Sequence, residues 1–176
     1  GAEINVQLDG KQLDRYACCS ELKMTDGIGY RDKTITGIGT FCHEYSHTLG
    51  LADLYDTDYE GSGGESAGVW ISTSLMDGGN HNNFGNTPPY YNAIEREMLG
   101  ICEPIRITSD GSYSLGPLDK TNTVYRIDTD HEDEYYLLEC RSGKGWDAYI
   151  GGKGMLVYHI DRSDRSSGYS ENYGRV

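Results

Sequence analysis

The sequence predicts an α+β protein in which one helix is followed by a β-rich lobe. Apolar residues recur at helical spacing over residues 38–49, and four strand-like runs separated by polar, turn-forming breaks follow residue 102. The 176 residues are enough for one domain, or for a domain with an attached lobe. We therefore expect a core over residues 1–101 and a β-rich C-terminal lobe over residues 102–176.

The composition argues against two classes of partner. The chain has 28 acidic and 15 basic residues, and its net charge is −13. A surface this acidic disfavours nucleic acid, because phosphate binding needs a basic surface. No apolar run approaches the roughly 20 residues of a membrane-spanning helix, so we expect no transmembrane segment. No signal peptide is present in this sequence, so an export signal would lie outside it.

The first 33 residues predict two short strands and a loop. Residues 3–10, EINVQLDG, are typical of a strand that ends in a turn at Asp9 and Gly10. Residues 14–24 are rich in apolar side chains, which fits a second strand. Residues 25–33 are polar and contain glycine, which is typical of a loop.

A helix is predicted from residue 34 or 36 to residue 49. Its apolar residues fall at i, i+3, i+4, i+7 and i+11 and form one stripe, which consists of Ile38, Phe41, Cys42, Tyr45 and Leu49. At about 100° per residue, His43, Glu44 and His47 project from the opposite side. We expect the apolar stripe to pack on a core and the histidine side to face a cleft.

The polar side of this helix carries a metal-binding motif. His43, Glu44 and His47 form the pattern H-E-x-x-H, and residues four apart share one face of a helix, so both histidines can reach one ion. This spacing is typical of zinc peptidases, in which two imidazoles bind the metal and the glutamate handles a water proton. Gly50 fits the left-handed position that follows a helix. The chain would turn back there and bring Asp53 towards the ion.

The motif alone would occur by chance in roughly two chains per hundred of this length, so a helix with two surface histidines is the alternative. A later turn at residues 74–78, SLMDG, favours the metal-binding hypothesis. It is similar to the Met turn, in which a methionine forms an apolar floor beneath a metal site. A lone methionine is normally core packing, but the position of Met76 after the motif favours the functional interpretation.

The loop over residues 53–70 is acidic and rich in glycine. Asp56, Asp58 and Glu60 suggest a structural calcium site, because hard cations bind several oxygen ligands. Their spacing is not that of an EF-hand, which favours a solvated loop instead. Asp56 could also orient a histidine ligand.

A proline pair introduces a second helix, predicted over residues 90–99 and closed by Gly100. Tyr90 and Tyr91 either pack or steady a developing oxyanion, and the sequence does not decide between these roles. Beyond this helix we expect four strands and no helix, with the strands at residues 105–107, 124–127, 135–140 and 155–160.

The five cysteines are odd in number and irregularly spaced, so no disulfide framework follows from them. Cys102 and Cys140 are the first pair to test. The chain has no C-x-x-C pattern, so a zinc site built from cysteines is not expected.

The combined pattern resembles the immune inhibitor A family of secreted bacterial zinc metallopeptidases, which is similar to the metzincins. Three segments carry the likeness, GIGTFCHEYSHTLGLADLYDTDY, SLMDGG and EYYLLECRSGKGWDAYIGGKGMLVYHIDRS, and the stretch PPYYNAIEREMLGICEP also fits. Together they span most of the chain from Gly37 to Ser163. The resemblance implies a metzincin-like, zinc-peptidase core with an active-site helix and a Met turn over residues 1–101, followed by the β-rich lobe.

The family pattern H-E-x-x-H-x-x-G-x-x-D implies Asp53 as the third zinc ligand, where metzincins usually have a histidine. The implied function is that of a zinc-dependent metalloendopeptidase, which hydrolyses peptide bonds of extracellular or host proteins through a metal-activated water. His43, His47 and Asp53 would bind Zn²⁺ and leave one position open, while Glu44 would act as the base. The resemblance also implies a secreted or cell-surface bacterial location. Calcium stays a second cofactor hypothesis.

Only 42 residues precede His43, which is little material for the sheet that usually backs such a helix. We therefore expect the sequence to begin inside a larger catalytic domain, with its front end truncated relative to the family.

Two alternatives come from other classes. An inactive, protease-like binding module that recognises peptides or glycoproteins would suit the high tyrosine content. However, a decayed enzyme has no reason to keep the histidines, Glu44 and Asp53 together. A structural zinc domain would close the fourth metal position with a protein ligand, commonly cysteine, and none is placed to do so.

Overall fold

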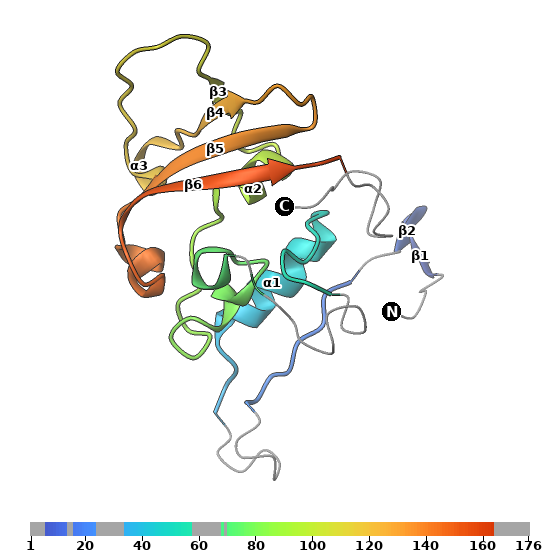
Figure 1. Cartoon of the computed structure of the whole chain (residues 1–176). Helices are drawn as coiled ribbons and strands as arrows, with labels where there is room; N and C mark the ends of the chain where they lie inside the picture. Colours follow the sequence, from blue (N-terminus) through green and yellow to red (C-terminus); the bar gives the residue numbers. More distant parts are fainter. Residues whose placement is uncertain (1–5, 14–15, 24–33, 58–67, 69, 164–176) are drawn as a thin grey trace.

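The computed structural model describes residues 6–13, 16–23, 34–57, 68 and 70–163. They form a four-stranded sheet at one end and a helical region at the other, with α2 (Ala93–Met98) between the sheet and α1 (Ile38–Thr48) (Figure 1). This mixture of helices and sheet confirms the predicted α+β class. In this part of the chain, no helix is long and apolar enough to cross a membrane.

The N-terminal residues form a hairpin of two three-residue strands, β1 (Val6–Leu8) and β2 (Lys11–Leu13), which pair antiparallel. Asp9 and Gly10 both have positive φ, 50° and 75°, as a two-residue hairpin turn requires. The first strand and its turn are therefore confirmed. The second strand predicted at residues 14–24 is wrong, because a two-residue turn requires the partner strand to start directly after Gly10. The described part of that range makes one isolated bridge and no strand.

Helix α1 begins at Ile38, later than predicted, because Gly37 has extended backbone angles. Its first turn lies against the backbone of η2 (Gly78–His81) and the loop that follows it. The Gly39 amide donates to the carbonyl of Gly85 over 2.8 Å. A Cβ at Gly39 would lie 1.9 Å from the Asn80 carbonyl oxygen, so only glycine permits this close approach.

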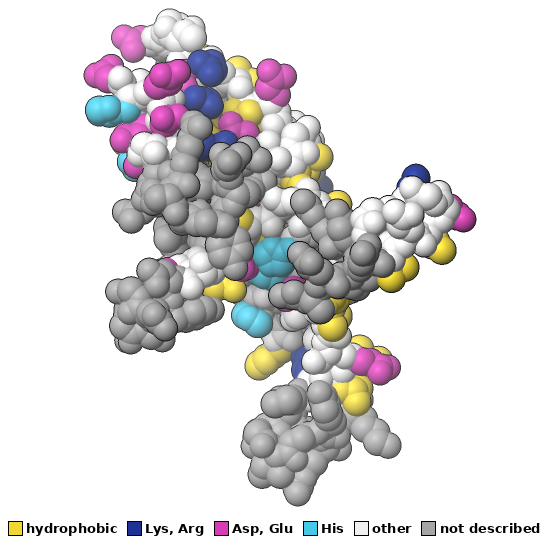
Figure 2. Space-filling model, turned by 90° about the vertical axis from the view of Figure 1, so that its right-hand side faces the viewer, with side chains coloured by type: hydrophobic (Ala, Val, Ile, Leu, Met, Phe, Trp, Pro, Cys, Tyr) yellow, Lys and Arg dark blue, Asp and Glu magenta, His cyan; other side chains and the backbone are white. Residues whose placement is uncertain are grey.

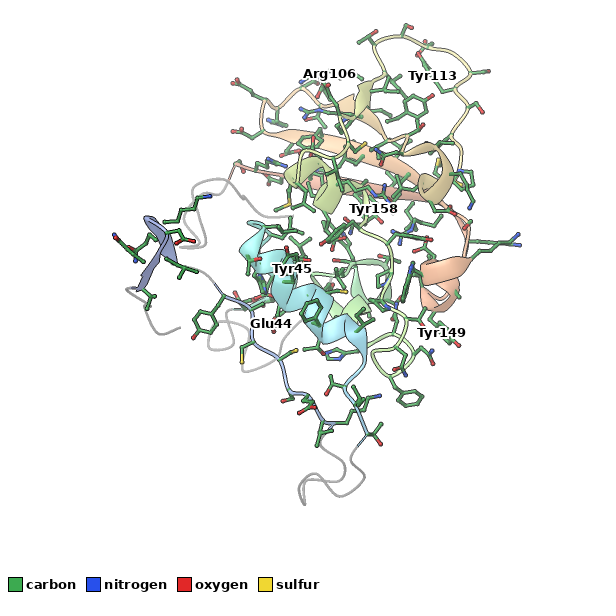
Figure 3. The ribbon with its side chains drawn as sticks, turned by 180° about the vertical axis from the view of Figure 1, so that it is seen from behind. Glu44, Tyr45, Arg106, Tyr113, Tyr149 and Tyr158 are labelled. Carbon is green, nitrogen blue, oxygen red and sulfur yellow. The ribbon has the colours of Figure 1, made fainter. Side chains whose placement is uncertain are left out.

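The predicted orientation of α1 is wrong. Its buried residues lie on the histidine side and are Gly39, His43 and Ser46. Most of the apolar stripe is about half exposed, at 48% for Ile38, 51% for Phe41, 50% for Tyr45 and 51% for Leu49, whereas Cys42 packs against the core. Figure 3 shows Glu44 and Tyr45 on this helix. Among the described residues, the elements that contact α1 pack on the histidine side, so helical periodicity identified the two faces but assigned them to the wrong environments.

Helix α2 begins three residues later than predicted. Its start is set by a capping box, in which the Glu95 amide donates to Asn92 Oδ1 over 3.0 Å and the Asn92 amide donates to Glu95 Oε2 over 2.7 Å. These two bonds, rather than the proline pair, fix the first turn. Gly100 closes the helix with a φ of 68°, as predicted.

The four strands of the main sheet lie in the order β3-β4-β5-β6. β3 (Ile105–Arg106) is parallel to β4 (Tyr125–Asp128), and β5 (Glu134–Arg141) pairs antiparallel with both β4 and β6 (Gly154–Asp161). All four predicted strands are confirmed to within a few residues.

The expectation of a lobe without helices is wrong. α3 (Leu118–Thr121) and the 3₁₀ helix η3 (Gly145–Tyr149) connect its strands. Each is only four or five residues long, so neither produces the repeated apolar spacing on which a helix prediction depends. The division of the chain after residue 101 stays a prediction.

One apolar core connects the sheet to the end of α1. Inward-facing side chains of β5 and β6 pair across the strands, as Leu137 does with Tyr158, and they pack towards α2. The buried apolar members of this core are Leu51, Leu54, Leu75, Met76, Ala93, Ile94, Cys102, Leu118, Val124, Tyr135, Leu137, Tyr158 and Ile160. The end of α1, the 74–78 turn, α2 and the sheet are therefore held by the same packing.

All five cysteines are free, so the pairing of Cys102 with Cys140 is wrong. The Cys102 thiol instead donates to the Asn122 carbonyl over 3.4 Å.

We expect Ile94→Ala to lower the free energy of unfolding by about 2–5 kcal/mol, because the side chain is fully buried and its removal leaves a cavity. Phe41→Ala, on the exposed stripe of α1, should cost about 1 kcal/mol or less. Urea denaturation followed by circular dichroism measures both variants. Equal losses would show that the stripe of α1 is covered and that the orientation described above is incorrect.

Candidate metal centre

His43 and His47 lie one turn apart on α1 and turn their rings towards the same space. Their ring centroids are 4.8 Å apart, and the ring planes are nearly perpendicular at 89°. The His43 side chain is buried at 7% exposure, whereas His47 keeps 31%. Figure 2 shows histidine side chains reaching the surface in the middle of the face that it displays. The pair is therefore partly shielded and partly open to solvent.

Two backbone carbonyls determine which nitrogen of each histidine ring is free to bind a metal. His43 Nδ1 lies 2.9 Å from the Leu75 carbonyl oxygen, and His47 Nδ1 lies 2.8 Å from that of Leu51. A carbonyl oxygen can only accept, so both Nδ1 atoms carry the hydrogen. In the neutral rings the free lone pair is then on Nε2, which is the atom left to bind a metal.

The turn after α1 is built by a Schellman motif. Gly50 has a φ of 105°, and its amide donates to the His47 carbonyl over 3.0 Å. The Leu51 amide donates to the Ser46 carbonyl over 3.2 Å, which is the second bond of the motif. The prediction for Gly50 is thus confirmed. The reversal places the Leu51 carbonyl beside His47 and brings Asp53 back towards both rings.

Asp53 completes a group of three converging donor atoms. Its Oδ1 lies 3.1 Å from His43 Nε2 and 3.4 Å from His47 Nε2. Ligands 2.0–2.1 Å from a tetrahedral zinc ion lie about 3.3 Å from one another, so these separations suit a common ion. Oδ1 is buried and, among the described residues, makes no hydrogen bond of acceptable geometry. This is expected if the three atoms point at one position instead of at each other.

The chemistry of the donor set also fits a metal. Two neutral imidazoles and one carboxylate are ligands of divalent transition metals. Within the described part of the chain, this trio is the one group of three or more metal-binding side chains, with all donor atoms within 4.8 Å of one another. The structure therefore brings together the three predicted ligands.

In the absence of a metal, Asp53 and the two histidines stabilise each other's charged forms. Burial lowers the pKa of His43, but contacts with Asp53 and the Leu75 carbonyl outweigh it, and the net pKa is raised. Contact with Asp53 raises the pKa of His47 despite partial burial, and the charge of Glu44 adds to this effect. Burial raises the pKa of Asp53, but both histidines counteract it and hold that pKa well below its ordinary value. The Asp53 carboxylate is therefore ionised and available as a ligand.

The 74–78 turn contacts both segments that carry the donor atoms, helix α1 and the bend that follows it. Met76 is fully buried, and its carbonyl accepts from the Leu54 amide over 2.9 Å, one residue beyond Asp53. Leu75, next to it in the chain, supplies the carbonyl bound to His43. One short turn thus contacts the helix and the bend that together carry the donor atoms.

Some expectations for neighbouring residues need correction. Backbone carbonyls hold the two Nδ1 atoms, so these atoms do not need Asp56 to orient the rings, and a role for Asp56 stays a prediction. The calcium hypothesis rests largely on Asp58 and Glu60, which lie outside the described residues. The Tyr91 hydroxyl lies 2.6 Å from Ser46 Oγ of α1, which favours the packing role of the two left open for this tyrosine.

Sequence reasoning missed Glu95, whose Oε1 accepts from the Met76 amide over 2.8 Å. The N-x-x-E pattern of Asn92 and Glu95 was the available signal, since it marks a capping box. The carbonyls that hold the histidines left no signal, because any residue can supply a carbonyl.

Part of the chain, including the residues of this site, is similar to known proteins. Residues 21–100 match the family model described as "Immune inhibitor A peptidase M6, catalytic domain". A protein named "Immune inhibitor A" from Bacillus thuringiensis subsp. alesti is 42% identical over 64 residues, which cover 35% of this chain and 9% of that protein. The chain thus matches less than a tenth of that relative's length. No solved structure gave a significant match. The predicted resemblance is confirmed over this partial region.

We expect zinc at about 100 times its Kd to raise the free energy of unfolding by about 2.7 kcal/mol, because the folded state alone brings the three donors together. His47→Ala and Asp53→Ala should lose most of this gain, and a chelator should reverse it in the parent protein. His131→Ala is the matched control, because His131 is exposed and lies in the distant lobe. Differential scanning calorimetry with and without zinc measures the effect. Equal zinc stabilisation in His47→Ala would exclude His47 as a ligand.

Proposed function

We propose that the chain is the metal-binding part of a zinc-dependent metalloendopeptidase, which hydrolyses peptide bonds of extracellular or host proteins. The observation that carries this proposal is the convergence of His43 Nε2, His47 Nε2 and Asp53 Oδ1, with both Nδ1 atoms already bonded to carbonyls. The match of residues 21–100 to a peptidase family supports it.

The proposed ligands are His43, His47 and Asp53, which leave a fourth tetrahedral position for water or substrate. Zinc bound there would lower the pKa of a bound water to about 7 and polarise the scissile carbonyl group. A structural zinc site would need a fourth protein ligand, and the described residues place no further histidine, cysteine or carboxylate with this trio.

The protein's own residues supply orientation and proton transfer. The Leu75 and Leu51 carbonyls hold the two rings in one tautomer and one orientation. The Glu44 carboxylate, partly exposed on α1 beside the histidines, accepts a proton from the attacking water and passes it to the leaving amine.

We also propose that the 74–78 turn acts as a Met turn. Met76 is fully buried within the core, and the peptide before it binds His43. An apolar residue there keeps water away from the inner side of the site, which strengthens electrostatic interactions between the ligands.

The resemblance supports three further proposals about the whole protein. Its substrates are proteins or peptides, it acts outside a bacterial cell or on the cell surface, and it does not bind nucleic acid, in line with the net charge of −13. A second, calcium-binding site in the 53–70 loop stays a prediction.

Glu44→Gln should reduce hydrolysis of casein by about 100-fold or more in the protein that carries this sequence, because general acid–base catalysis contributes about 10²–10⁴-fold. Zinc binding should be unchanged, since Glu44 is not among the converging donors. Glu103→Gln, an exposed carboxylate outside the site, should retain full activity.

Two results would contradict the proposal. A Glu44→Gln variant that cleaves casein as fast as the parent would exclude Glu44 as the base. A parent protein that binds one zinc ion but cleaves no protein substrate would favour the inactive binding module.

A further inference from the structure

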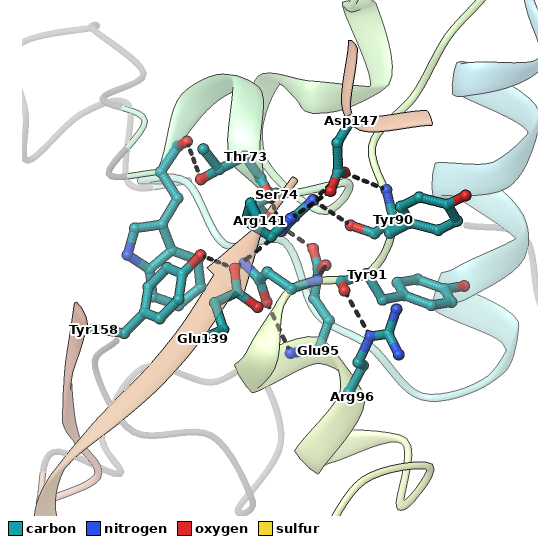
Figure 4. Close-up of polar contacts among 12 residues, drawn as sticks. Thr73, Ser74, Tyr90, Tyr91, Glu95, Arg96, Glu139, Arg141, Asp147 and Tyr158 are labelled. Atoms are coloured by element: carbon teal, nitrogen blue, oxygen red, sulfur yellow. Dashed lines mark hydrogen bonds and ion pairs between the residues drawn. The ribbon is translucent and has the colours of Figure 1, made fainter. Parts of the chain in front are cut away.

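Glu95 is a fully buried carboxylate with an unusual division of its hydrogen bonds. Its Oε2 closes the capping box by accepting from the Asn92 amide. Its Oε1 accepts instead from two donors outside α2, the Ser74 hydroxyl over 2.7 Å (Figure 4) and the Met76 amide over 2.8 Å. Capping explains only one of the two oxygens, so the other is committed to the 74–78 turn.

Burying a carboxylate is costly unless it is well bonded. Burial raises the pKa of Glu95, and its three hydrogen bonds and the positive charge of Arg141 offset this rise only in part. All three neighbours donate to Glu95, so the bonding pattern suits the ionised carboxylate. A neutral side chain of similar size would cap α2 without this cost, which indicates a further role for the charge.

The Met76 amide and the Leu75 carbonyl belong to the same peptide group. A peptide group is planar and normally trans, so its N–H and C=O point in opposite directions. The N–H of this peptide points at Glu95, and its C=O accepts from His43 Nδ1 over 2.9 Å. A single rigid plane therefore connects the buried carboxylate to the proposed metal ligand.

Two physical effects pass through this plane. The carboxylate fixes the position of the carbonyl, and thereby the orientation of the His43 ring. Hydrogen bonds in series also polarise one another, so an N–H bonded to a carboxylate makes the carbonyl a stronger acceptor. A stronger acceptor at Nδ1 makes Nε2 a better metal ligand, as a carboxylate bonded directly to a ligand histidine does.

Arg141 holds α2, which carries Glu95, and the 74–78 turn in fixed positions relative to each other. It is 1% exposed and donates to the carbonyls of Tyr90, over 3.1 Å, and Thr73, over 3.3 Å (Figure 4). Its remaining donors pair with Glu139 and Asp147. These bonds hold the chain just before α2 and just before the 74–78 turn. They therefore fix the distance between Glu95 on α2 and the turn.

We propose that Glu95 is a positioning residue for the metal site, which orients His43 and tightens metal binding through the Leu75–Met76 peptide. The proposal rests on the proposed function, since it assumes that His43 binds the metal. Glu95 lies in the interior and acts on the ion only through this peptide and the histidine.

The test compares zinc affinity in the parent protein, Glu95→Gln and Glu97→Gln by competition with a chromophoric chelator. Changes to groups that support a metal ligand typically cost about 10–100-fold in affinity, and we expect Glu95→Gln to fall in this range. Glu97→Gln is the matched control on the same helix, because Glu97 binds Tyr135 and Arg162 and not the turn. Its zinc affinity should equal that of the parent.

The absorption spectrum of bound cobalt distinguishes a positioning role of Glu95 from a purely structural one. With Co²⁺ in place of zinc, Glu95→Gln should shift the visible absorption bands that report ligand geometry, whereas Glu97→Gln should not. Circular dichroism and urea denaturation of the metal-free proteins establish that each variant is folded. If Glu95→Gln does not fold, Ser74→Ala replaces it, since it removes one donor to Oε1 with little change in volume. This variant should weaken zinc binding roughly 2- to 10-fold, and Ser74→Thr should restore part of the loss.

The outcomes separate the two proposals. A folded Glu95→Gln with parental zinc affinity and an unchanged cobalt spectrum overturns the role of Glu95 and leaves the metal site intact. Parental affinity in Ser74→Ala, where that variant is needed, also overturns it. A parent protein that binds no zinc overturns the proposed function and this inference together.

Discussion

The hydrogen bond between His43 Nδ1 and the Leu75 carbonyl is the contact on which the rest of the site depends. It fixes the tautomer of a buried imidazole, so that Nε2 faces Asp53 with a free lone pair. It also ties α1 to the 74–78 turn, whose next carbonyl receives the Leu54 amide beside Asp53. Elements that are distant in the chain are thereby held around one point by backbone groups, which cannot change rotamer as side chains do.

This arrangement explains why the polar side of α1 is the buried one. The proposed metal site needs low solvent access and rigid supports, and both follow when the histidine side lies against other elements. Gly39 allows the backbone of η2 to approach it, and Ser46 is bonded to Tyr91. Every polar group placed there requires a partner, because an unpaired buried donor or acceptor is costly. Among the described residues, Asp53 Oδ1 has no hydrogen bond of acceptable geometry, as expected for an oxygen that binds an ion.

Local patterns in the sequence predicted the parts of the site that depend on local geometry. The four-residue spacing of His43 and His47 and the glycine at position 50 act within a single helix and its end, so they could be identified directly. The strands of the lobe also followed from their apolar runs and turns. The environment of each face of α1 could not be predicted, because periodicity shows that two faces differ and not which elements cover them. Glu95 was missed for a related reason. Its contacts with Ser74 and Met76 span 21 and 19 residues of sequence, and only the fold brings them together.

The central claim is that His43, His47 and Asp53 bind one zinc ion through Nε2, Nε2 and a carboxylate oxygen while both Nδ1 atoms stay bonded to backbone carbonyls. A crystal structure of the zinc-loaded protein, with diffraction data collected at the zinc absorption edge, tests it most directly. The account predicts one strong anomalous peak about 2.0–2.2 Å from these three atoms, with a fourth position open to solvent. A zinc ion bound at other side chains, or bound through either Nδ1, would contradict it.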